Sequence, residues 1–482
     1  MDQAHPILSQ FPFQPSADQL KFFTQFYDFL RAPEPDPIYI LRGYAGTGKT
    51  SCVAAIVKSI KSFNMQVVLL APTGRAAKVM ANYAAKPAYT IHKKIYRKKS
   101  ALSFDMRMQI APNLHKNTLF IVDEASMIDD TYNPQMGSSI LNDLLNYVFQ
   151  VGEDGKTKGC KLLLVGDTAQ LPPVGSENSP ALNAKYLKHE YHFSIWESEM
   201  KIVLRQESES GILYNATHIR KLIAKQDNSS LTIPKLKANS FSDLYLMNGI
   251  KLVEGLEYAY QKYGMDQTLV VCRSNKSATS YNAQIRARVL YREETITGGD
   301  HIMIVKNNYF WLPENPFTAF IANGDMAKVT RVRKTESRYG LTFAELSLEF
   351  VDYPELGQVS CKCILDTLSS DSPHLSYEQQ KKLYEHLMED YAHLSKSEQF
   401  QAIKADPYYN ALQIKFAYAV TCHKAQGGQW EAVFVDQGYL VEDQLNTSFL
   451  RWLYTAFTRA KSALFLVNFS AKFFPNQSFD LE

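Results

Sequence analysis

The chain lacks paired cysteines, long apolar runs and any large excess of charge. Its six cysteines are scattered without a C-x-x-C spacing, which argues against a zinc ribbon and a disulfide framework. We interpret Cys361 and Cys363 as two strand cysteines that face opposite ways, and not as a fragment of a metal site. No apolar run approaches the ~20 residues of a membrane span, and the N-terminus has no signal-peptide core. We therefore expect no membrane association and a reduced, cytoplasmic compartment.

Length and charge place few limits on the function. At 482 residues the chain is longer than a single core usually supports, so we expect more than one domain. Hydrophobic residues make up 45% and charged residues 21%, which is ordinary for a globular protein. A net charge of +3 favours polyanionic partners only weakly. The function must therefore be argued from motifs.

One octapeptide, residues 43–50, fits the P-loop pattern G-x-x-x-x-G-K-[ST] in full. The apolar run 37–41 before it predicts a buried strand, and residues 51–62 after it predict a helix. In this context glycines let backbone N–H groups surround phosphate oxygens, and the helix N-terminus adds a partial positive charge. Lys49 is expected to reach the β- and γ-phosphates of ATP, and Thr50 to bind Mg²⁺. The expected nucleotide cradle comprises Gly43, Ala45, Gly46, Thr47, Gly48, Lys49 and Thr50.

Continuous apolar runs alternate with helical patterns and predict two parallel sheets, because strands covered on both faces are apolar throughout. Residues 298–365 show alternating patterns and turn signals, as in a small antiparallel barrel, and residues 376–405 are polar and helical. We expect residues 298–410 to be inserted into the second sheet domain. The runs of the first sheet are 66–70, 119–122 and 162–165, and those of the second are 268–272, 432–435 and 463–467.

Polar residues follow two strands of the first predicted sheet, where ligands of open α/β sheets bind. Asp123 and Glu124 come directly after the strand 119–122 in a Walker B arrangement. Asp123 is expected to hold Mg²⁺, and Glu124 to act as the general base for the attacking water. Gln170 follows the next strand and is expected to bond the γ-phosphate or that water.

These segments carry a family resemblance. The P-loop, Asp123-Glu124-Ala125-Ser126 and Gly166-Asp167-x-x-Gln170-Leu171-Pro172-Pro173, in this order, resemble motifs I, II and III of superfamily 1 helicases. The closest similarity is to the RecD-like and Dda-like 1B branch, and it extends across nearly the whole chain. It implies an α/β fold of two RecA-like P-loop parallel-sheet domains with a small 1B insertion and an SH3-like β-barrel plus helical 2B insertion. The implied domains are 1A at 1–200, with 1B at about 88–116, 2A at 201–297 and 411–482, and 2B at 298–410.

Further segments resemble the remaining motifs of the family. Gln19 matches the Q-motif glutamine, whose amide can read adenine. Arg205 lies in a segment similar to motif IV and Arg459 in one similar to motif VI, and the resemblance implies that both reach the γ-phosphate as arginine fingers. Residues 421–427 resemble motif V. Gly428 stands where the pattern has Ser, and we count it among the expected nucleotide contacts.

Basic residues cluster at 92–99, with Tyr96 among them. This composition suits neutralisation of a nucleic-acid backbone and stacking on a base, whereas a solvated helix face is the alternative interpretation. The cluster falls where the family inserts subdomain 1B, and residues 71–77 resemble motif Ia, a DNA backbone contact. The nucleic-acid contacts expected from composition and resemblance are Pro72, Thr73, His92, Lys93, Tyr96, Asn275, Asn308, Thr421, His423, Lys424 and Gln426.

Taken together, the motifs predict an ATP-dependent DNA helicase or translocase that uses Mg²⁺, with 5′→3′ polarity implied by the resemblance alone. Expected partners are single-stranded and forked DNA and proteins of replication, recombination or repair, and we expect a monomer. One alternative is a RecD-like motor subunit of a recombination or repair nuclease, and another is an RNA- or protein-displacing ATPase. A nucleotide-gated module or clamp-loader-like ATPase is a third, which the second sheet disfavours. The expected catalytic set is Lys49, Glu124, Gln170, Arg205 and Arg459.

Overall fold

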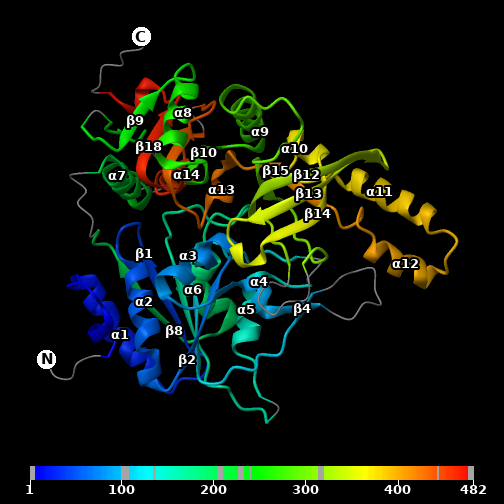
Figure 1. Ribbon diagram of the computed structural model, residues 1–482. Helices are drawn as coiled ribbons and strands as arrows, with labels where there is room; N and C mark the ends of the chain where they lie inside the picture. The colour runs from blue at the N-terminus through cyan, green and yellow to red at the C-terminus, as the bar shows by residue number, and fades with distance from the viewer. Residues whose placement is uncertain are drawn as a thin grey trace. The chain divides into compact units, whose positions relative to one another are not determined.

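Two compact units make up the protein (Figure 1). Unit 1 comprises Met1–Pro234 and Asp443–Thr458, and unit 2 comprises Lys235–Glu442 and Arg459–Glu482. The computed structural model describes residues 6–98, 108–133, 137–152, 154–203, 210–225, 233–238, 240–312, 320–441 and 444–475. Within these ranges, no helix is both long enough and apolar enough to cross a bilayer.

Unit 1 is built on a six-stranded sheet with the order β3-β2-β6-β7-β1-β8, in which every neighbouring pair is parallel. The strands expected at 37–41, 66–70, 119–122 and 162–165 are confirmed as β1, β2, β6 and β7. The strands are β1 (Ile38–Gly43), β2 (Gln66–Ala71), β3 (Ala88–Thr90), β6 (Thr118–Val122), β7 (Lys161–Gly166) and β8 (Ile195–Met200).

Helices cover both faces of this sheet, which explains why its central strands are apolar throughout. In β1, Tyr39 and Leu41 enter a core with α1 and α2, whereas Ile38 and Ile40 enter a second core with α5 and α6. A short antiparallel pair, β4 (Tyr96–Lys98) and β5 (Met108–Ile110), follows α4. The helices of unit 1 are α1 (Ala17–Arg31), α2 (Lys49–Ser59), α3 (Gly74–Ala84), α4 (Ile91–Ile95), α5 (Ile140–Val148), α6 (Ala184–Tyr191), α7 (Gly211–Lys225) and α14 (Thr447–Phe457).

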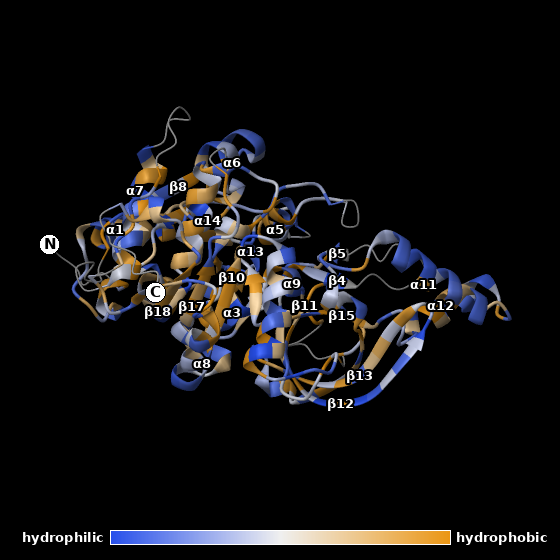
Figure 2. Ribbon diagram, turned by 90° about the horizontal axis from the view of Figure 1, so that it is seen from above, coloured by the Kyte–Doolittle hydropathy of each residue, from blue (hydrophilic) through white to orange (hydrophobic). Residues whose placement is uncertain are grey.

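Unit 2 contains a second parallel sheet of five strands, in the order β16-β10-β17-β18-β9. The strands expected at 268–272, 432–435 and 463–467 are confirmed within β10, β17 and β18, and Figure 2 shows the apolar character of β10. The strands are β9 (Leu244–Met247), β10 (Thr268–Cys272), β16 (Ala419–Thr421), β17 (Trp430–Asp436) and β18 (Ala460–Val467). The helices of unit 2 are α8 (Leu252–Tyr263), α9 (Asn275–Gln284), α10 (Asp366–Ser369), α11 (Tyr377–Asp390), α12 (Lys396–Ala405) and α13 (Cys422–Ala425).

In chain order, a closed five-stranded barrel lies between β10 and β16 of the second sheet, and the alternating pattern predicted such a barrel. Its last strand, β15, lies beyond the expected insertion boundary at residue 410 and closes the barrel between β14 and β11. The end of β12 is hydrophilic in Figure 2, because it extends past the short β11. The barrel strands are β11 (His301–Ile304), β12 (Met326–Arg338), β13 (Leu341–Phe350), β14 (Gln358–Ile364) and β15 (Leu412–Phe416).

The prediction that Cys361 and Cys363 face opposite ways is wrong. Both residues lie on β14, and residues two apart in a strand point to the same face. Their Sγ atoms are 4.0 Å apart in the barrel core, and both thiols are free. Within the described ranges, no group of three or more His, Cys, Asp or Glu residues could hold a metal ion.

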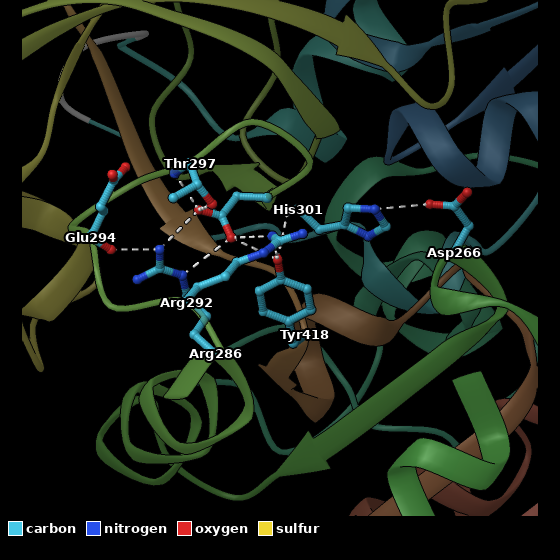
Figure 3. Close-up of polar contacts among 8 residues, drawn as sticks. Asp266, Arg286, Arg292, Glu294, Thr297, His301 and Tyr418 are labelled. Atoms are coloured by element: carbon cyan, nitrogen blue, oxygen red, sulfur yellow. Dashed lines mark hydrogen bonds and ion pairs between the residues drawn. The ribbon is translucent and has the colours of Figure 1, made fainter. Parts of the chain in front are cut away.

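A buried carboxylate joins the barrel to the second sheet (Figure 3). Asp300, just before β11, accepts hydrogen bonds from Arg286 Nε at 3.1 Å, Arg292 Nη1 at 2.5 Å and the Tyr418 hydroxyl at 2.8 Å. Burial opposes ionisation of Asp300, but these donors and the Thr297 N–H outweigh it and hold the pKa of Asp300 below its usual value. Arg286 follows α9 and Tyr418 precedes β16, so one anion ties three segments of unit 2 together.

The two units divide the chain differently from the expected domains. Helix α7 lies beyond the expected end of 1A at residue 200, and α14 lies within the expected 2A. Both belong to unit 1, where they pack against each other. The domain boundaries implied by the resemblance remain a proposal.

Candidate nucleotide and nucleic-acid sites

The octapeptide 43–50 forms a tight loop between β1 and α2, as expected of a P-loop. Gly46 and Gly48 have φ angles of 79° and 82°, a conformation that favours glycine. A Cβ atom on Gly43 would lie 2.9 Å from Thr47 Oγ1 and 3.1 Å from Lys49 Cγ. The glycines are therefore required by the path of the backbone. They leave the N-terminus of α2, an eleven-residue helix, facing the loop.

Lys49 is the first residue of α2, and its ammonium group lies over the loop. Lys49 Nζ donates to the carbonyl oxygens of Gly43 at 2.5 Å and Tyr44 at 2.9 Å. A phosphate bound by Lys49 would compete with these two carbonyls. Thr50, the next residue, is exposed, so its hydroxyl is accessible to a ligand.

Gln19 is fully buried and supports the P-loop from α1. Its Oε1 accepts from the Ser16 N–H at 3.0 Å in a capping box, and its Nε2 donates to the Thr47 carbonyl at 3.1 Å. Each end of the amide thus already has one partner within the protein. The adenine-reading role stays a prediction, and the structure adds a second role in fixing the loop.

Asp123 and Glu124 follow β6 at the carboxyl edge of the sheet. Asp123 Oδ1 accepts from the Glu124 N–H at 2.9 Å, and Asp123 Oδ2 accepts from the Tyr83 hydroxyl at 2.7 Å. Glu124 has a φ of 52°, which is uncommon for a residue with a side chain and is typical of strained functional positions. Sequence reasoning did not identify Tyr83, because nothing in α3 marks it as a partner of the acid.

Gln170 lies in the loop after β7 and is 5% exposed. Among the residues that the structure describes, its Oε1 atom has no hydrogen-bond partner. An unpaired buried amide oxygen is costly and suits a site that receives a donor such as a water molecule. Gly166 brings this loop close to the acidic motif, since a Cβ there would lie 3.1 Å from the Ser126 N atom.

The residues expected to bind Mg²⁺ suit that ion. Mg²⁺ prefers oxygen ligands and usually takes only one or two from the protein, with phosphates and water supplying the others. The Thr50 hydroxyl is exposed, and each Asp123 oxygen retains lone-pair capacity beyond its single hydrogen bond. The donor set therefore fits a magnesium–nucleotide complex.

The two residues after β2 that are expected to contact the DNA backbone lie just before α3. Thr73 caps α3 by accepting from the Ala76 N–H at 3.2 Å, with Pro72 immediately before it. His92 lies on α4, where burial lowers its pKa to about 4, with Asp143 opposing the shift. His92 is therefore neutral near pH 7 and adds no positive charge to the basic cluster.

The expected stacking role of Tyr96 conflicts with its position. Tyr96 is 8% exposed in the core of unit 1, and its hydroxyl donates to Asp143 Oδ2 at 2.7 Å. Tyr89, only half-buried, takes its place among the cations: Lys93 Nζ and Lys94 Nζ lie 5.9 Å and 5.4 Å from its ring centroid. Tyr89 lies on β3 and Tyr96 is the first residue of β4, and composition alone could not show which of the two is buried.

In unit 2, the motif V segment runs from β16 into α13. Lys424 Nζ bonds Asn323 Oδ1 of the barrel loop, and burial lowers the pKa of Lys424 to about 8. Arg459 is 3% exposed and donates to the Gly428 carbonyl at 3.0 Å, so Gly428 contacts the motif VI arginine through its backbone. The other expected contacts of this segment are Thr421 and His423, both half-buried, and Gln426, which is buried.

The remaining expected residues differ in exposure. Asn275 is exposed at the first position of α9, after the carboxyl end of β10. Asn308 is half-buried, and its side chain donates to the Asn410 carbonyl at 2.7 Å and accepts from the Phe310 N–H at 3.0 Å. Asn308 therefore stabilises a loop of the barrel in this structure. Arg205 lies outside the described residues.

Two families of known proteins match parts of the chain. Residues 31–176 match the family described as AAA domain, and residues 416–467 match the UvrD-like helicase C-terminal domain. The first match spans the P-loop, the acidic motif and Gln170, and the second spans motifs V and VI.

Individual relatives cover the chain to different extents. The ATP-dependent RecD2 DNA helicase of Deinococcus radiodurans is 33% identical over 28% of this chain and 16% of its own length. The ATP-dependent DNA helicase dda of Enterobacteria phage T4 is 22% identical over 63% of this chain and 64% of its own. A solved structure of Pif1 helicase from Bacteroides with ADP-AlF3 and ssDNA is 14% identical, with a TM-score of 0.48 over 96% of this chain and 94% of that one.

The order of the two matched families along the chain follows the order of the motifs. The match to the AAA domain contains Lys49, Asp123 and Glu124, and the match to the helicase C-terminal domain contains Arg459. Over these matched segments the chain is similar to superfamily 1 helicases of the RecD-like 1B branch.

Proposed function

We propose that this protein is a motor that hydrolyses ATP to move along single-stranded DNA and to unwind duplex DNA, with 5′→3′ polarity. The observation that carries the proposal is the carboxyl edge of the sheet in unit 1. There β1, β6 and β7 end in the P-loop with Lys49, the pair Asp123–Glu124 and the unpaired amide oxygen of Gln170. This is the set that phosphoryl transfer to water requires.

Each residue has a distinct role in the proposed hydrolysis. Lys49 and the loop amides bind the phosphates, and Glu124 accepts a proton from the attacking water. Gln170 orients that water through its free Oε1 atom. Thr50 and Asp123 would hold Mg²⁺, which neutralises charge on the phosphates when it is bound. Arg459 and Arg205 are proposed to stabilise the charge that develops on the γ-phosphate.

Single-stranded DNA is the proposed partner because polar and basic groups follow strands of both sheets. In unit 1 these groups are Thr73 at the start of α3 and Lys93 beside Tyr89. In unit 2 they are Asn275 at the start of α9 and Lys424 in motif V. Contacts of this kind bind phosphates and sugars without reading sequence, which suits a protein that travels along a strand.

The first test is ATP hydrolysis with and without single-stranded DNA, with Lys49→Ala as the control. Strong stimulation by the strand, lost in Lys49→Ala, is the expected result. Unwinding of 5′-tailed but not 3′-tailed duplexes would then establish polarity. Hydrolysis that is indifferent to DNA would contradict the proposal, and stimulation by RNA alone would favour the RNA-displacing alternative.

A requirement for a second protein would instead favour a motor subunit of a nuclease. Hydrolysis per enzyme that rises with enzyme concentration would favour a clamp-loader-like ATPase, because such enzymes complete the site from a neighbouring copy. A monomeric motor gives constant hydrolysis per enzyme.

A further inference from the structure

One buried phenol contacts both loops of the nucleotide site. Tyr454, in α14, is 1% exposed. Its hydroxyl donates to Asp167 Oδ2 at 2.7 Å and accepts from the backbone N–H of Ala45 at 2.9 Å. Ala45 is the third residue of the P-loop, and Asp167 directly follows β7. A single oxygen atom therefore links the P-loop backbone to the segment that carries Gln170.

A neighbouring hydroxyl makes a second link to the same segment. Thr455 is fully buried, and its Oγ1 atom accepts from the Leu171 N–H at 2.9 Å. Leu171 is adjacent to Gln170 in the chain. Consecutive residues of α14 thus hold the two loops, and both contacts lie within unit 1.

Asp167 is arranged to keep the phenol in place. It is fully buried, and its Oδ1 atom accepts from the Ala169 N–H at 2.9 Å. Its Oδ2 atom accepts from Tyr454, and hydrogen bonds to an ionised acceptor are roughly twice as strong as neutral ones. Burial and the Asp167 carboxylate hold the pKa of Tyr454 well above its usual value, so the phenol remains protonated. With its proton committed to Asp167, the oxygen presents lone pairs to the Ala45 amide.

We propose that Tyr454 is a positioning residue for ATP hydrolysis, which fixes the Ala45 backbone and the Gln170 loop relative to each other. This inference rests on the proposed ATPase function and assigns a role that the family motifs did not supply for this residue. Loss of the hydroxyl leaves a buried carboxylate oxygen and a P-loop amide short of one partner each. Both loops would then shift relative to each other, and small misplacements at a reacting centre reduce turnover strongly.

The test compares two substitutions that each remove a tyrosine–aspartate hydrogen bond from unit 1. Tyr454→Phe removes the bond to Asp167. The matched control, Tyr191→Phe, removes the bonds of 2.8 Å and 3.0 Å to the two carboxylate oxygens of Asp130. Asp130 keeps Tyr186 as a donor in that control. Both variants are made in the full chain, and kcat, KM for ATP, ADP affinity and thermal unfolding are measured.

We expect Tyr454→Phe to lower kcat at least tenfold, with ADP affinity and KM within threefold of the wild-type values. Tyr191→Phe should keep kcat within twofold. An unchanged kcat in Tyr454→Phe would overturn the proposal, as would equal losses in both variants. If Tyr454→Phe does not fold, Thr455→Val is the second variant; it removes the bond from the Leu171 N–H and a 2.7 Å bond to the Arg451 carbonyl within α14. It is expected to show the same loss of kcat at unchanged ADP affinity, and normal turnover in it would overturn the proposal.

A readout that needs no activity separates this inference from the proposed function. Amide hydrogen exchange of peptides covering residues 43–48 and 166–171 should be faster in Tyr454→Phe than in wild type, and unchanged in Tyr191→Phe. Absence of that difference overturns the positioning role even if the wild type is a helicase. If the exchange difference is present but the wild-type protein shows no DNA-stimulated hydrolysis, the motor function is refuted and the positioning role of Tyr454 is not.

Discussion

The Tyr83 hydroxyl donates a 2.7 Å hydrogen bond to Asp123 Oδ2, which ties helix α3 to the acid at the end of β6. Thr73, an expected DNA contact, caps the N-terminus of α3, and Tyr83 is near the other end of that helix. One helix therefore connects an expected DNA-binding residue with an expected ligand of Mg²⁺.

Replacing Tyr83 by Phe should weaken the use of Mg²⁺ by the enzyme. The substitution removes the donor that orients Asp123, and loss of such partners commonly costs about 10- to 100-fold in metal affinity or activity. The measurement is the Mg²⁺ concentration that gives half-maximal ATP hydrolysis, which should rise about tenfold. Tyr186→Phe, which loses a 2.5 Å bond to Asp130, serves as the control and should not shift it. Equal Mg²⁺ dependence in all three proteins would contradict the role of Tyr83.

Substitutions of Tyr89 and Tyr96, the two tyrosines near α4, should differ in their effects: one on DNA binding and the other on stability. Tyr89→Ala should reduce affinity for single-stranded DNA, because stacking of one base on an aromatic ring contributes about 1–3 kcal/mol. Tyr96→Phe should leave that affinity unchanged and lower stability, since its hydroxyl pairs with Asp143 inside the core. Fluorescence anisotropy with a labelled oligonucleotide and thermal unfolding report the two effects. Weaker DNA binding in Tyr96→Phe, with normal binding in Tyr89→Ala, would instead assign the DNA contact to Tyr96.

Asp300→Asn should destabilise unit 2 markedly. The substitution leaves Arg286 and Arg292 without their buried counter-charge, and breaking a buried ion pair typically costs about 3–5 kcal/mol. Chemical denaturation followed by fluorescence measures the change. Loss of less than about 1 kcal/mol would mean that the barrel is held by its apolar contacts alone.

Asp300→Asn should also change how the stability of the protein depends on pH. The pKa of Asp300 is lower in the folded protein than in the unfolded chain, so its stabilising effect is complete above the unfolded value of about 4. That effect is lost as pH falls from there through the lower folded pKa. Asp300→Asn should therefore show a shallower loss of stability below about pH 4 than wild type. Parallel acid-denaturation curves would argue against this linkage.

Arg459→Ala should abolish turnover and leave nucleotide binding largely intact. Loss of an arginine finger reduces hydrolysis by on the order of a thousandfold or more. The measurement pairs kcat with ADP affinity, and Arg451→Ala, on the preceding helix, is the control. Arg451 bonds the Glu177 carbonyl at the surface of unit 1. Normal turnover in Arg459→Ala would remove it from the catalytic set.

The sequence predicted the central strands because they are buried on both sides and therefore apolar throughout. It did not predict β8, an edge strand that mixes polar with apolar side chains and in which Met200 alone is buried. The P-loop was recognisable because eight consecutive residues form it. The link between Tyr454 and Asp167 was not, because 287 positions separate the two residues and only the fold brings them together.

The return of α14 to unit 1 has a consequence for dividing the protein into fragments. A single cut after Pro234 would yield an N-terminal piece without its last helix, and the second piece would carry a helix whose apolar residues have lost their neighbours. The smallest self-sufficient version of unit 1 must therefore be assembled from two non-contiguous stretches. Split-protein reporters or permuted variants should be designed around a linker that joins residue 234 to residue 443.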